Sequence, residues 1–394
     1  MWFMNNKQSV FRRKIVLFLN TILLLSISFL GASVRFETKI HKLVQDSVEI
    51  IVSQEVAELM KSSGYEMISG ALYIRGKTFQ FHYGKLSNGK KPDTNTLFEI
   101  GSVTKTYTGL LLSQAVYDKK VNLDEDIRTY IEGSYPNLIM SNGQPITLRH
   151  LITHTSGLPM NINCMGFGQK IEEQLSCFKS FLSKAFFQAL KEIKLKDNSH
   201  DQYNYSNAGV QLVGYILENT YKLPYKALLE KYIFSRSDEQ ETYFTIEKVL
   251  EKKLSIGKNS EKKLMPLINN GYQYAGGLKS STSSMLNYIR MYLENDDPVI
   301  IQSMNLLKGN MQNGRAYVWN TYNYNQDYKM LYHSGGTLGH SSWIALYPNQ
   351  KTGLFMVTNI YTNDSQRDLN ELSNKIIDRL KKLKKIKINR FSEQ

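Results

Sequence analysis

Apolar positions near both ends of the chain follow the pattern of β-strands. The apolar run Met67–Ile74 is followed, after Gly76, by Thr78–Tyr83, in which polar and aromatic residues alternate. Alternation with a period of two is typical of a strand, and a glycine between two such runs favours a tight turn. We therefore expect a β-hairpin here. Three further runs predict consecutive strands near the end of the chain: Tyr328–His333, Ser341–Tyr347 and Leu354–Ile360.

Helical spacing dominates most of the remaining sequence. Residues 34–62 carry apolar side chains at intervals of three and four, which predicts one helix, and the stretch from about 103 to 295 is predicted to be mostly helical. A last helix is predicted near the end of the chain, because five apolar side chains are spaced to share one of its faces. These side chains are Leu369, Leu372, Ile376, Leu380 and Leu383.

These patterns together predict an α+β fold. Strands from both chain ends can assemble into one antiparallel sheet, with the helical middle of the chain inserted beside it. We expect one domain at residues 34–390, with its sheet parts at about 34–101 and 296–390 and its helical insert at about 102–295. The cleft between the sheet and the inserted helices is the natural place for an active site.

Residues 1–33 have the pattern of an export signal or a membrane anchor. Basic residues between Lys7 and Lys14 precede the apolar run Ile15–Leu30, and small residues follow that run. We expect cleavage near Ala32, which would place the mature protein in the periplasm or outside the cell. The run is short for a membrane span, but an uncleaved anchor formed by the same run stays open.

Basic residues outnumber acidic ones, and the formal net charge is +14. Seven basic residues lie between Arg379 and Arg390, in the last predicted helix. Lysines on the solvent side of a packed helix explain this cluster, and attraction to a membrane surface or to anionic envelope polymers is the alternative. Nucleic-acid binding is not expected of an exported chain without a recognition motif.

The cysteines and histidines give little indication of a metal site. Cys164 and Cys177 lie close together in one segment, and in an exported protein they either form a disulfide or remain two free thiols. The seven histidines show no metal-binding spacing such as His-Glu-x-x-His. We therefore expect no metal and no cofactor.

The most informative motif is a serine that precedes a lysine by three residues. On a helix, Ser102 and Lys105 would lie on nearly the same face, one turn apart. An unassisted serine hydroxyl is a poor nucleophile, but a partly desolvated lysine amine can take its proton. This pair is therefore a candidate for acyl-enzyme chemistry.

Sequence context separates Ser102 from four other serines with the same spacing. Only Ser102 follows a short apolar strand, Leu97–Ile100, and a glycine, and only Ser102 opens a long apolar-periodic helix. The alternative role for Ser102 is simple capping of that helix. The other serines lie in a predicted turn, in a helix with no strand before it, or in a Lys/Glu-rich stretch expected to be exposed: Ser87, Ser176, and the pair Ser255 and Ser260, respectively.

Two later segments supply further candidate residues. Tyr205 and Asn207 introduce an amphipathic helix from a polar loop. A neighbouring lysine ammonium can lower the pKa of a tyrosine phenol, which could then relay a proton, and Asn207 offers its amide to a peptide-like substrate and to the lysine. The alternative is a buried core tyrosine followed by a helix-capping asparagine.

The segment His333–Gly336 ends a strand that we expect to lie at the sheet edge, where glycines let an extended substrate approach the backbone closely. A competing triplet, Lys351-Thr352-Gly353, follows Pro348 and lies between two apolar strands. We interpret that triplet as a hairpin turn facing away from the cleft.

Together, the motifs Ser102-x-x-Lys105, Tyr205-x-Asn207 and His333-x-Gly335 resemble the three ordered motifs of the serine β-lactamase and penicillin-binding protein superfamily. The resemblance covers about residues 65–385, and the sequence holds no Ser-Asp-Asn motif, which disfavours class A. The class C branch contains β-lactamases, D,D-carboxypeptidases and endopeptidases, D-amino-acid peptidases and esterases. Segments similar to that branch are Phe98–Ser102, Gln144–Leu151, Ala275–Leu278 and His154–Pro159, the last of which we interpret as a structural turn.

The resemblance implies roles for these residues. Ser102 would be the nucleophile, Lys105 its proton partner and Tyr205 the general base and acid, while Asn207 would hold the substrate amide. The backbone N–H groups of Ser102 and Gly336 would form the oxyanion hole. The same strand would bind the substrate through His333, Ser334 and Gly335, with the Ser334 hydroxyl on the substrate carboxylate.

One residue departs from the pattern of the family. His333 stands where β-lactamases and D,D-peptidases usually have lysine, which carries a permanent positive charge. An ordinary histidine is charged only below about pH 6.5. We therefore expect weak β-lactam turnover and carboxylate recognition that declines above the pKa of His333.

The sequence thus predicts an exported serine hydrolase that forms an acyl-enzyme on Ser102. The expected substrates are D,D-peptide ends of peptidoglycan peptides or related small amides, and β-lactams would act as acylating ligands that turn over slowly. A short-chain esterase of the same fold is the nearest alternative. A catalytically silent member that binds cell wall or lipid is another, although the intact motifs argue against it.

Overall fold

The computed structural model describes residues 45–162, 173, 176, 183–195, 202–268, 272–323 and 328–391. The chain divides into two compact units, Glu58–Lys375 and the combination of Met1–Ala57 with Ile376–Gln394. The first unit contains every candidate site residue. The predicted export segment and both cysteines lie outside the described residues. Of the helices that are described, none is both long enough and apolar enough to cross a membrane.

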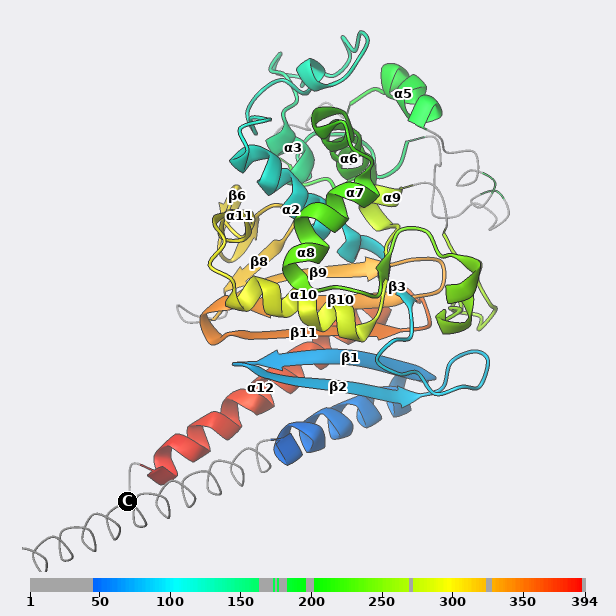
Figure 1. The fold of residues 1–394 in the computed structure, drawn as a ribbon, viewed down its shortest axis with the longest axis vertical. Coiled ribbons are helices and arrows are strands. Elements are labelled where there is room, and N and C mark those ends of the chain that lie inside the picture. Colours follow the sequence, from blue (N-terminus) through cyan, green and yellow to red (C-terminus); the bar gives the residue numbers. More distant parts are fainter. Residues whose placement is uncertain are drawn as a thin grey trace, which may run out of the picture. The chain divides into compact units, whose positions relative to one another are not determined.

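In the described part of the chain, eight antiparallel strands form the main sheet, in the order β2-β1-β11-β10-β9-β8-β7-β6 (Figure 1). Strands from the start of the chain pair with strands from its end, as where Ser69 of β1 faces Val357 of β11. The predicted α+β fold is therefore confirmed. The strand bounds are β1 (Met67–Ile74), β2 (Lys77–Gly84), β6 (Lys308–Asn310), β7 (Asn313–Arg315), β8 (Asn320–Asn323), β9 (Lys329–Gly336), β10 (Ser341–Tyr347) and β11 (Thr352–Thr358).

The strands β6, β7 and β8 are not predicted by the sequence periodicity, because they are short and mostly polar. They extend the sheet beyond β9, so the expectation that β9 is an edge strand is wrong for its first half. β8 pairs with Lys329–Tyr332. In the described pairings, His333–Gly336 is matched with β10 alone, which leaves the other side of this segment open.

The apolar strand predicted before Gly101 forms, but it does not join the main sheet. β3 (Phe98–Glu99) pairs with β5 (Lys279–Ser280), and β5 pairs with β4 (Thr242–Tyr243). Two strands of this small second sheet, β4 and β5, therefore lie inside the stretch predicted to be mostly helical. Its strand β3 leads directly into the turn that carries Ser102.

Helices cover the main sheet and make up most of the described elements between β3 and β6 in the sequence. Helix α10 packs against β1 and β11, and α2 packs against α6, α9 and α11 (Figure 1). The helix predicted at residues 34–62 is described from 45 to 63. The other described helices and helical turns are η1 (Gly101–Val103), α2 (Thr104–Tyr117), η2 (Ile127–Tyr130), α3 (Leu148–Ile152), α5 (Ser183–Glu192), α6 (Asn207–Tyr221), α7 (Tyr225–Leu229), η3 (Glu230–Phe234), α8 (Ser235–Ser237), η4 (Lys248–Lys253), α9 (Gln273–Gly276), α10 (Thr282–Glu294), α11 (Pro298–Ser303), η5 (Pro348–Gln350) and α12 (Ser365–Phe391).

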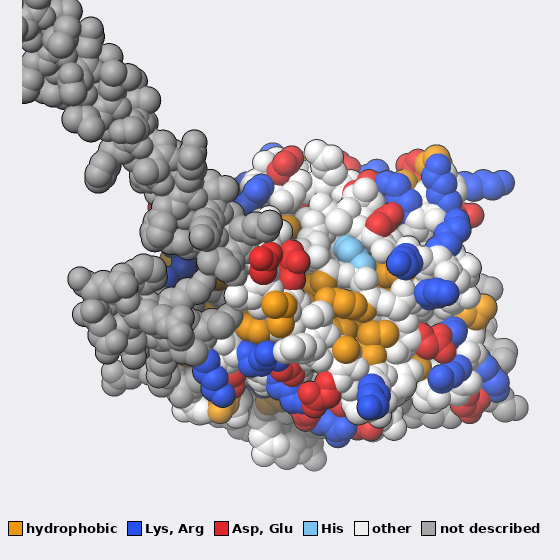
Figure 2. All heavy atoms as spheres, turned by 90° about the horizontal axis from the view of Figure 1, so that it is seen from below, with side chains coloured by type: hydrophobic (Ala, Val, Ile, Leu, Met, Phe, Trp, Pro, Cys, Tyr) orange, Lys and Arg blue, Asp and Glu red, His pale blue; other side chains and the backbone are white. Residues whose placement is uncertain are grey.

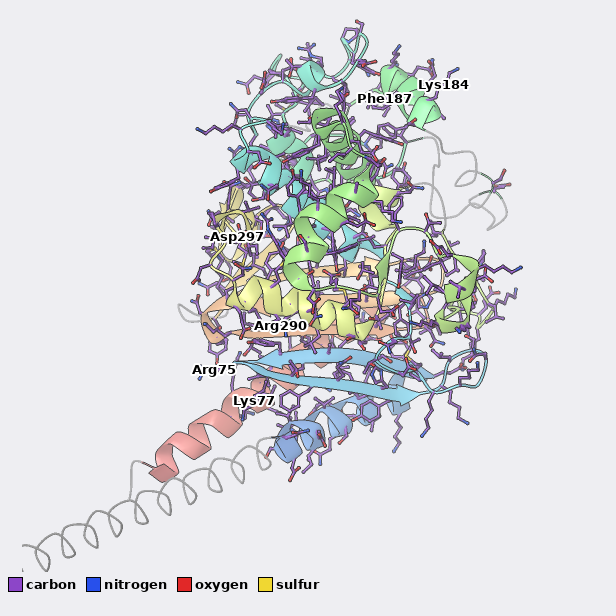
Figure 3. The ribbon with its side chains drawn as sticks, in the orientation of Figure 1. Arg75, Lys77, Lys184, Phe187, Arg290 and Asp297 are labelled. Atoms are coloured by element: carbon purple, nitrogen blue, oxygen red, sulfur yellow. The ribbon has the colours of Figure 1, made fainter. Side chains whose placement is uncertain are left out.

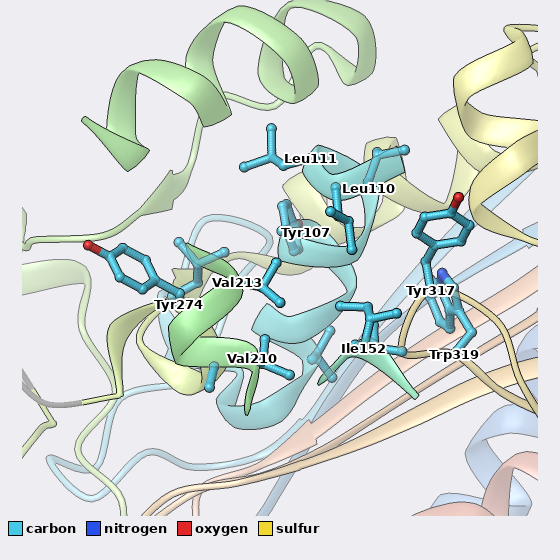
Figure 4. Packing of buried hydrophobic residues seen from close by; sticks show 14 of the residues in the cluster. Tyr107, Leu110, Leu111, Ile152, Val210, Val213, Tyr274, Tyr317 and Trp319 are labelled. Atoms are coloured by element: carbon cyan, nitrogen blue, oxygen red, sulfur yellow. The ribbon is translucent and has the colours of Figure 1, made fainter. Parts of the chain in front are cut away.

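Helix α2 is the central helix of the core and is buried over almost its whole length. The Tyr107 ring stacks on that of Tyr288, with ring centroids 4.1 Å apart. Close packing on every side holds a helix in one position, because any shift would open voids or create clashes. The start of α2, where the Ser102–Lys105 motif lies, is therefore held rigidly. Figure 4 shows side chains of α2 packed among those of α3 and α6, including Tyr107, Leu110, Leu111, Ile152, Val210 and Val213.

The last helix, α12, confirms the predicted apolar stripe where its side chains are described. Leu369, Leu372 and Ile376 are buried, whereas Arg379 forms an ion pair with Glu55 at 2.7 Å. On the described part of the face drawn in Figure 2, basic side chains are interspersed with acidic ones. The basic side chains of the cluster beyond residue 382 lie outside the described side chains, so both interpretations of the cluster stay predictions.

The turn interpretation of Lys351-Thr352-Gly353 is confirmed. Lys351 has a φ of +47° after the helical turn η5, and β11 begins at the next residue. The Lys351 carbonyl accepts a hydrogen bond from the backbone N–H of Arg75 at 2.8 Å, so this turn lies beside the β1–β2 turn, where Figure 3 labels Arg75. Since Gly336 pairs with Ser341 at the opposite end of β10, the triplet is remote from the Ser102 motif.

Candidate active site

Ser102 lies in a tight helical turn between the small sheet and α2. Gly101 precedes it with a φ of +52°, a left-handed conformation that glycine adopts at little cost. Helix α2 begins at Thr104 and has no side-chain cap. Capping by Ser102 is therefore wrong as an explanation of the motif.

Lys105 is fully buried, and its Nζ contacts three oxygen atoms. It lies 2.9 Å from Ser102 Oγ, 2.7 Å from Asn207 Oδ1 and 2.6 Å from the backbone oxygen of Ala275. None of these partners carries a negative charge, so they offset the loss of hydration only in part. Burial consequently lowers the pKa of Lys105 well below its ordinary value. A buried amine of this kind can accept the proton of a serine hydroxyl.

The hydroxyl group of Tyr205 lies within hydrogen-bond distance of Ser102. That hydroxyl donates to Ser102 Oγ at 2.7 Å, and Lys105 Nζ lies 4.9 Å from the centre of the Tyr205 ring. Burial raises the pKa of the Tyr205 phenol, so the expectation that the nearby lysine lowers it is wrong. In the resting site Tyr205 is a neutral hydrogen-bond donor, and the group available to accept a proton is the Lys105 amine.

Asn207 is the first residue of α6, but it does not cap this helix. The cap is Ser206, whose Oγ accepts a hydrogen bond from the backbone N–H of Gly209 at 2.9 Å. Asn207 Oδ1 accepts from Lys105, and its Nδ2 donates to Asn161 Oδ1 at 2.9 Å. The side chain therefore orients the lysine and joins the first two motifs. Its expected contact with a substrate amide stays a prediction.

The end of β9 passes close to the backbone that precedes Ser102. A Cβ on Gly101 would lie 2.6 Å from the backbone nitrogen of Gly336, and a Cβ on Gly335 would lie 2.1 Å from the backbone oxygen of Ile100. Glycine at these positions permits the approach. The third motif is thereby brought beside the first, as an oxyanion hole built from two backbone N–H groups requires.

His333 is buried, and its pKa is lowered to about 3 by burial, with further contributions from the charges of Lys105 and Arg315. Its Nδ1 lies 2.6 Å from the backbone oxygen of Ser334, an acceptor, so Nδ1 carries the proton. The ring is therefore neutral at ordinary pH. The decline of carboxylate recognition above the pKa of His333 stays a prediction, and the lowered pKa moves it from near pH 6.5 to about pH 3.

Arg315, at the end of β7, is a charged residue of this region that the motifs do not reveal. Its guanidinium carbon lies 4.1 Å from the centre of the Tyr203 ring. Burial is the main cause of the low pKa values of His333 and His154, and the Arg315 charge lowers both further. No local signal could have identified Arg315, because the pairing of a short polar strand depends on the whole sheet.

His154 both forms the predicted turn and contacts the site. Its φ is +59°, which confirms the turn, and its ring centroid lies 4.7 Å from that of Tyr205. The pKa values of Lys105, His154 and His333 are all lowered, and among the described residues no carboxylate contributes to these shifts. Burial therefore favours the neutral forms of these three groups, and Arg315 supplies the permanent positive charge of this region, which favours an anionic group on whatever binds there.

The other candidate serines differ in their surroundings. Ser176 and Ser260 are exposed, and Ser87 lies beside a turn. Ser255 is fully buried, so the expectation that it lies in an exposed stretch is wrong. Among the described residues, no group of histidine, cysteine and acidic side chains is arranged to hold a metal ion.

Residues 52–376 match the Beta-lactamase family. The chain belongs to this family. The resemblance identified from the three motifs is thereby confirmed, and the family is one of serine hydrolases. The order and contacts of the motifs in this β-lactamase-family protein agree with that assignment.

Individual relatives have diverged far from this chain. A β-lactamase of Yersinia enterocolitica is 24% identical over 279 residues, which cover 70% of this chain and 66% of that protein. The aligned parts span between 61% and 66% of the curated relatives' own length, which is less than two thirds.

Solved structures share the fold. A class C β-lactamase in complex with cefoxitin matches with a TM-score of 0.72 at 21% identity, covering 85% of this chain and 99% of that one. A β-lactamase/D-alanine carboxypeptidase of Yersinia pestis, complexed with citrate, matches with a TM-score of 0.72 at 20% identity, covering 84% and 99%.

Proposed function

We propose that this protein is an exported serine hydrolase that cleaves amide bonds through an acyl-enzyme on Ser102. One observation carries the proposal: Ser102 Oγ is hydrogen-bonded both by Lys105 Nζ at 2.9 Å and by the Tyr205 hydroxyl at 2.7 Å. Acyl transfer needs a base to take the proton of the nucleophile and an acid to supply one to the leaving group. The two contacts supply one of each.

In the acylation step, Ser102 Oγ attacks the substrate carbonyl carbon while its proton moves to the Lys105 amine. The carbonyl oxygen becomes an oxyanion, held by the backbone N–H groups of Ser102 and Gly336. When the C–N bond breaks, the leaving nitrogen takes a proton from the Tyr205 phenol. The Lys105 ammonium returns a proton to Tyr205, which restores the resting state of both groups.

Hydrolysis of the acyl-enzyme uses the same groups in reverse. A water molecule adds to the ester carbon and gives a proton to the Tyr205–Lys105 pair, and the Ser102 oxygen takes a proton back as it leaves. Asn207 keeps the lysine oriented in both steps through its 2.7 Å contact. No cofactor enters this scheme.

We assign the substrates to small amides that bear a carboxylate, with D,D-peptide ends of peptidoglycan as the main class. The permanent charge of Arg315, beside Tyr203, supports an anionic group next to the reacting carbonyl. Because His333 is neutral, Arg315 would supply the permanent charge, with the Ser334 hydroxyl as a further donor. Structural relatives that are a D,D-type carboxypeptidase or hold cefoxitin fit peptides and β-lactams as ligands.

Arg315→Ala tests this assignment. We expect kcat/KM for a carboxylate-bearing peptide to fall about ten- to hundredfold, the size of a lost charge-assisted contact, and kcat/KM for a neutral ester to change little. The ratio of the two values should stay constant between pH 5 and 8, because the pKa of His333 is about 3. Arg290→Ala, at an exposed position of α10 (Figure 3), is the matched control. Equal losses for both substrates would remove Arg315 from carboxylate binding.

A short-chain esterase is the second candidate, and the neutral His333 favours it, because a simple ester requires no cationic partner. The catalytically silent alternative is opposed by the unbroken hydrogen bonds among Ser102, Lys105, Tyr205 and Asn207. Incubation with a D-Ala-D-Ala peptide, a penicillin and a simple ester, followed by mass spectrometry of the protein, distinguishes these functions. The acyl group that attaches and the time for which it persists identify the preferred substrate.

The nucleophile is tested by substitution. A fluorescent penicillin should label the purified protein, and Ser102→Ala should abolish the label because the attacking oxygen is gone. Ser260→Ala, at an exposed serine with the same spacing to a lysine, should label as the wild type does. Labelling that survives Ser102→Ala would falsify the assignment of the nucleophile.

Export is the remaining part of the proposal. The basic and apolar pattern of residues 1–33 supports it, with cleavage near Ala32 or retention of residues 15–30 as an anchor. Cell fractionation and the N-terminal mass of the mature chain distinguish the two outcomes. Recovery of the full-length chain only in the cytoplasm would contradict export.

A further inference from the structure

Three buried polar side chains form a hydrogen-bonded series outside the group that contacts Ser102. His340 Nδ1 lies 3.4 Å from Glu99 Oε2, and His340 Nε2 lies 3.1 Å from Ser255 Oγ. The exposed fractions are 3% for Glu99, 1% for His340 and 0% for Ser255. The groups follow the order serine, histidine, carboxylate, which is that of a hydrolytic triad.

The negative charge on Glu99 determines the direction of the hydrogen bond between Glu99 and His340. Burial by itself would raise the pKa of the carboxyl, but the His340 hydrogen bond, the Lys279 charge and the backbone N–H of Ile268 hold that pKa below its usual value. An ionised carboxylate only accepts hydrogen bonds, so His340 Nδ1 donates to it. The other ring nitrogen, Nε2, contacts the Ser255 hydroxyl.

Burial excludes Ser255 as a second nucleophile. Its exposed fraction is 0%, so a substrate carbonyl cannot approach the hydroxyl. The neighbouring backbone is also tightly packed, because a Cβ on Gly257 would lie 2.1 Å from the backbone oxygen of Gly339. The role of the three hydrogen-bonded side chains is therefore to hold neighbouring segments of the backbone together.

Both ends of this hydrogen-bonded series, Glu99 and Ser255, are attached to the segment that leads into Ser102. Glu99 belongs to β3, and only Ile100 and Gly101 separate it from Ser102. Ser255 is tied to the same segment, because its backbone N–H donates to the backbone oxygen of Leu97 at 2.8 Å. Displacement of either side chain would therefore be transmitted to the turn that carries the nucleophile.

The middle member, His340, is attached to the turn that follows Gly336. The backbone N–H of His340 donates to Thr337 Oγ1 at 3.0 Å, and the backbone N–H of Thr337 donates to the His340 oxygen at 3.0 Å. Thr337 is the next residue after Gly336, so the position of the His340 backbone determines that of the Gly336 N–H. The His340 side chain thus connects the two segments that supply the oxyanion hole.

We propose that Glu99, His340 and Ser255 form a positioning bridge that sets the spacing between the two backbone donors of the oxyanion hole. The inference rests on the proposed function, in which those donors hold the developing oxyanion. Small errors in donor position weaken transition-state stabilisation more than substrate binding. Loss of the bridge should therefore slow acylation and leave the half-saturating substrate concentration unchanged.

The test measures acylation by a fluorescent penicillin at increasing concentrations, which separates the limiting rate constant from half-saturation. We expect His340→Phe to lower the rate constant about ten- to hundredfold, with smaller losses for Glu99→Gln and Ser255→Ala. His340→Gln, whose amide can both donate and accept, should recover part of the rate. The matched control is His82→Phe in β2, which removes another histidine–serine contact, His82 Nδ1 to Ser69 Oγ at 3.2 Å.

The number of labels per chain separates positioning from a merely structural role. A reduced rate constant with one label per chain supports the bridge. A normal rate constant with fewer labelled chains indicates misfolding alone and overturns it, as do rates within twofold of the wild type for all folded variants. If His340→Phe does not fold, Glu99→Gln and Ser255→Ala decide.

Two further results are informative. Mass spectrometry that places the label on Ser255 would overturn the bridge, because it would make Ser255 a nucleophile. If the wild type takes no penicillin label, the proposed substrate class fails, and the same rate constants are then measured with a p-nitrophenyl ester. The bridge is therefore tested separately from the function on which it rests.

Discussion

Lys105→Met should remove nearly all acylation of Ser102, lowering the rate constant by about 10³- to 10⁴-fold. Methionine preserves the unbranched apolar stem of lysine but supplies no amine, so the serine proton loses its acceptor. The effect is expected to be large because Lys105 Nζ is 2.9 Å from the attacking oxygen. Single-turnover labelling with a fluorescent penicillin measures this rate.

The pH dependence gives a second measure of the same role. In the wild type, acylation should become faster as the pH rises through the lowered pKa of Lys105, because only the neutral amine accepts a proton. Tyr205 should add no transition near neutrality, since its pKa is raised. Lys105→Met should lose the rising limb. Lys329→Met removes another partly buried lysine, at the far end of β9, and should retain that limb. A rising limb that persists in Lys105→Met would contradict the assignment of the base.

Tyr205→Phe should reduce peptide turnover by about 10²- to 10⁴-fold, the usual contribution of general acid–base catalysis. Phenylalanine preserves the ring contact with His154 at 4.7 Å and removes only the hydroxyl. A peptide nitrogen must be protonated as it leaves, whereas p-nitrophenolate leaves without a proton. We therefore expect a much smaller loss with a p-nitrophenyl ester.

Steady-state rates with the peptide and the ester give this comparison. Tyr117→Phe, at an exposed position at the end of α2, is the control and should affect both substrates little. Equal losses for peptide and ester in Tyr205→Phe would show that the hydroxyl does not serve as the acid for the leaving group. Its contact with Ser102 would then serve orientation alone.

Local patterns in the sequence predict much of the fold. The β1–β2 hairpin follows from an apolar run before Gly76 and an alternating run after it, and the Lys351 turn follows from its polar residues between apolar strands. Both depend on neighbours along the chain, and the structure confirms both. The edge position expected for β9 fails only for Lys329–Tyr332, which β8 covers. The strands β6, β7 and β8 are short and polar and are stable only when they are added to an existing sheet.

The candidate site, like the fold, could be predicted from the sequence only in part. Spacing along the chain paired Ser102 with Lys105, because three residues along a helical segment place two side chains together. The strand, glycine and helix around this pair separated it from four other serines with the same spacing. It could not show that Ser255 is buried against His340, or that β7 places Arg315 near Tyr203. Those contacts join residues far apart in the sequence.

The sequence by itself determined the β1–β2 hairpin, the strands near the end of the chain and the choice of Ser102 as candidate nucleophile, because these depend on local spacing and on residue type. Only the tertiary structure decided the protonation of the site. It lowers the pKa of Lys105 and that of His333 and raises that of Tyr205, mainly through burial. Burial is a property of the packed molecule, since the loss of water around a charge depends on every segment that surrounds it.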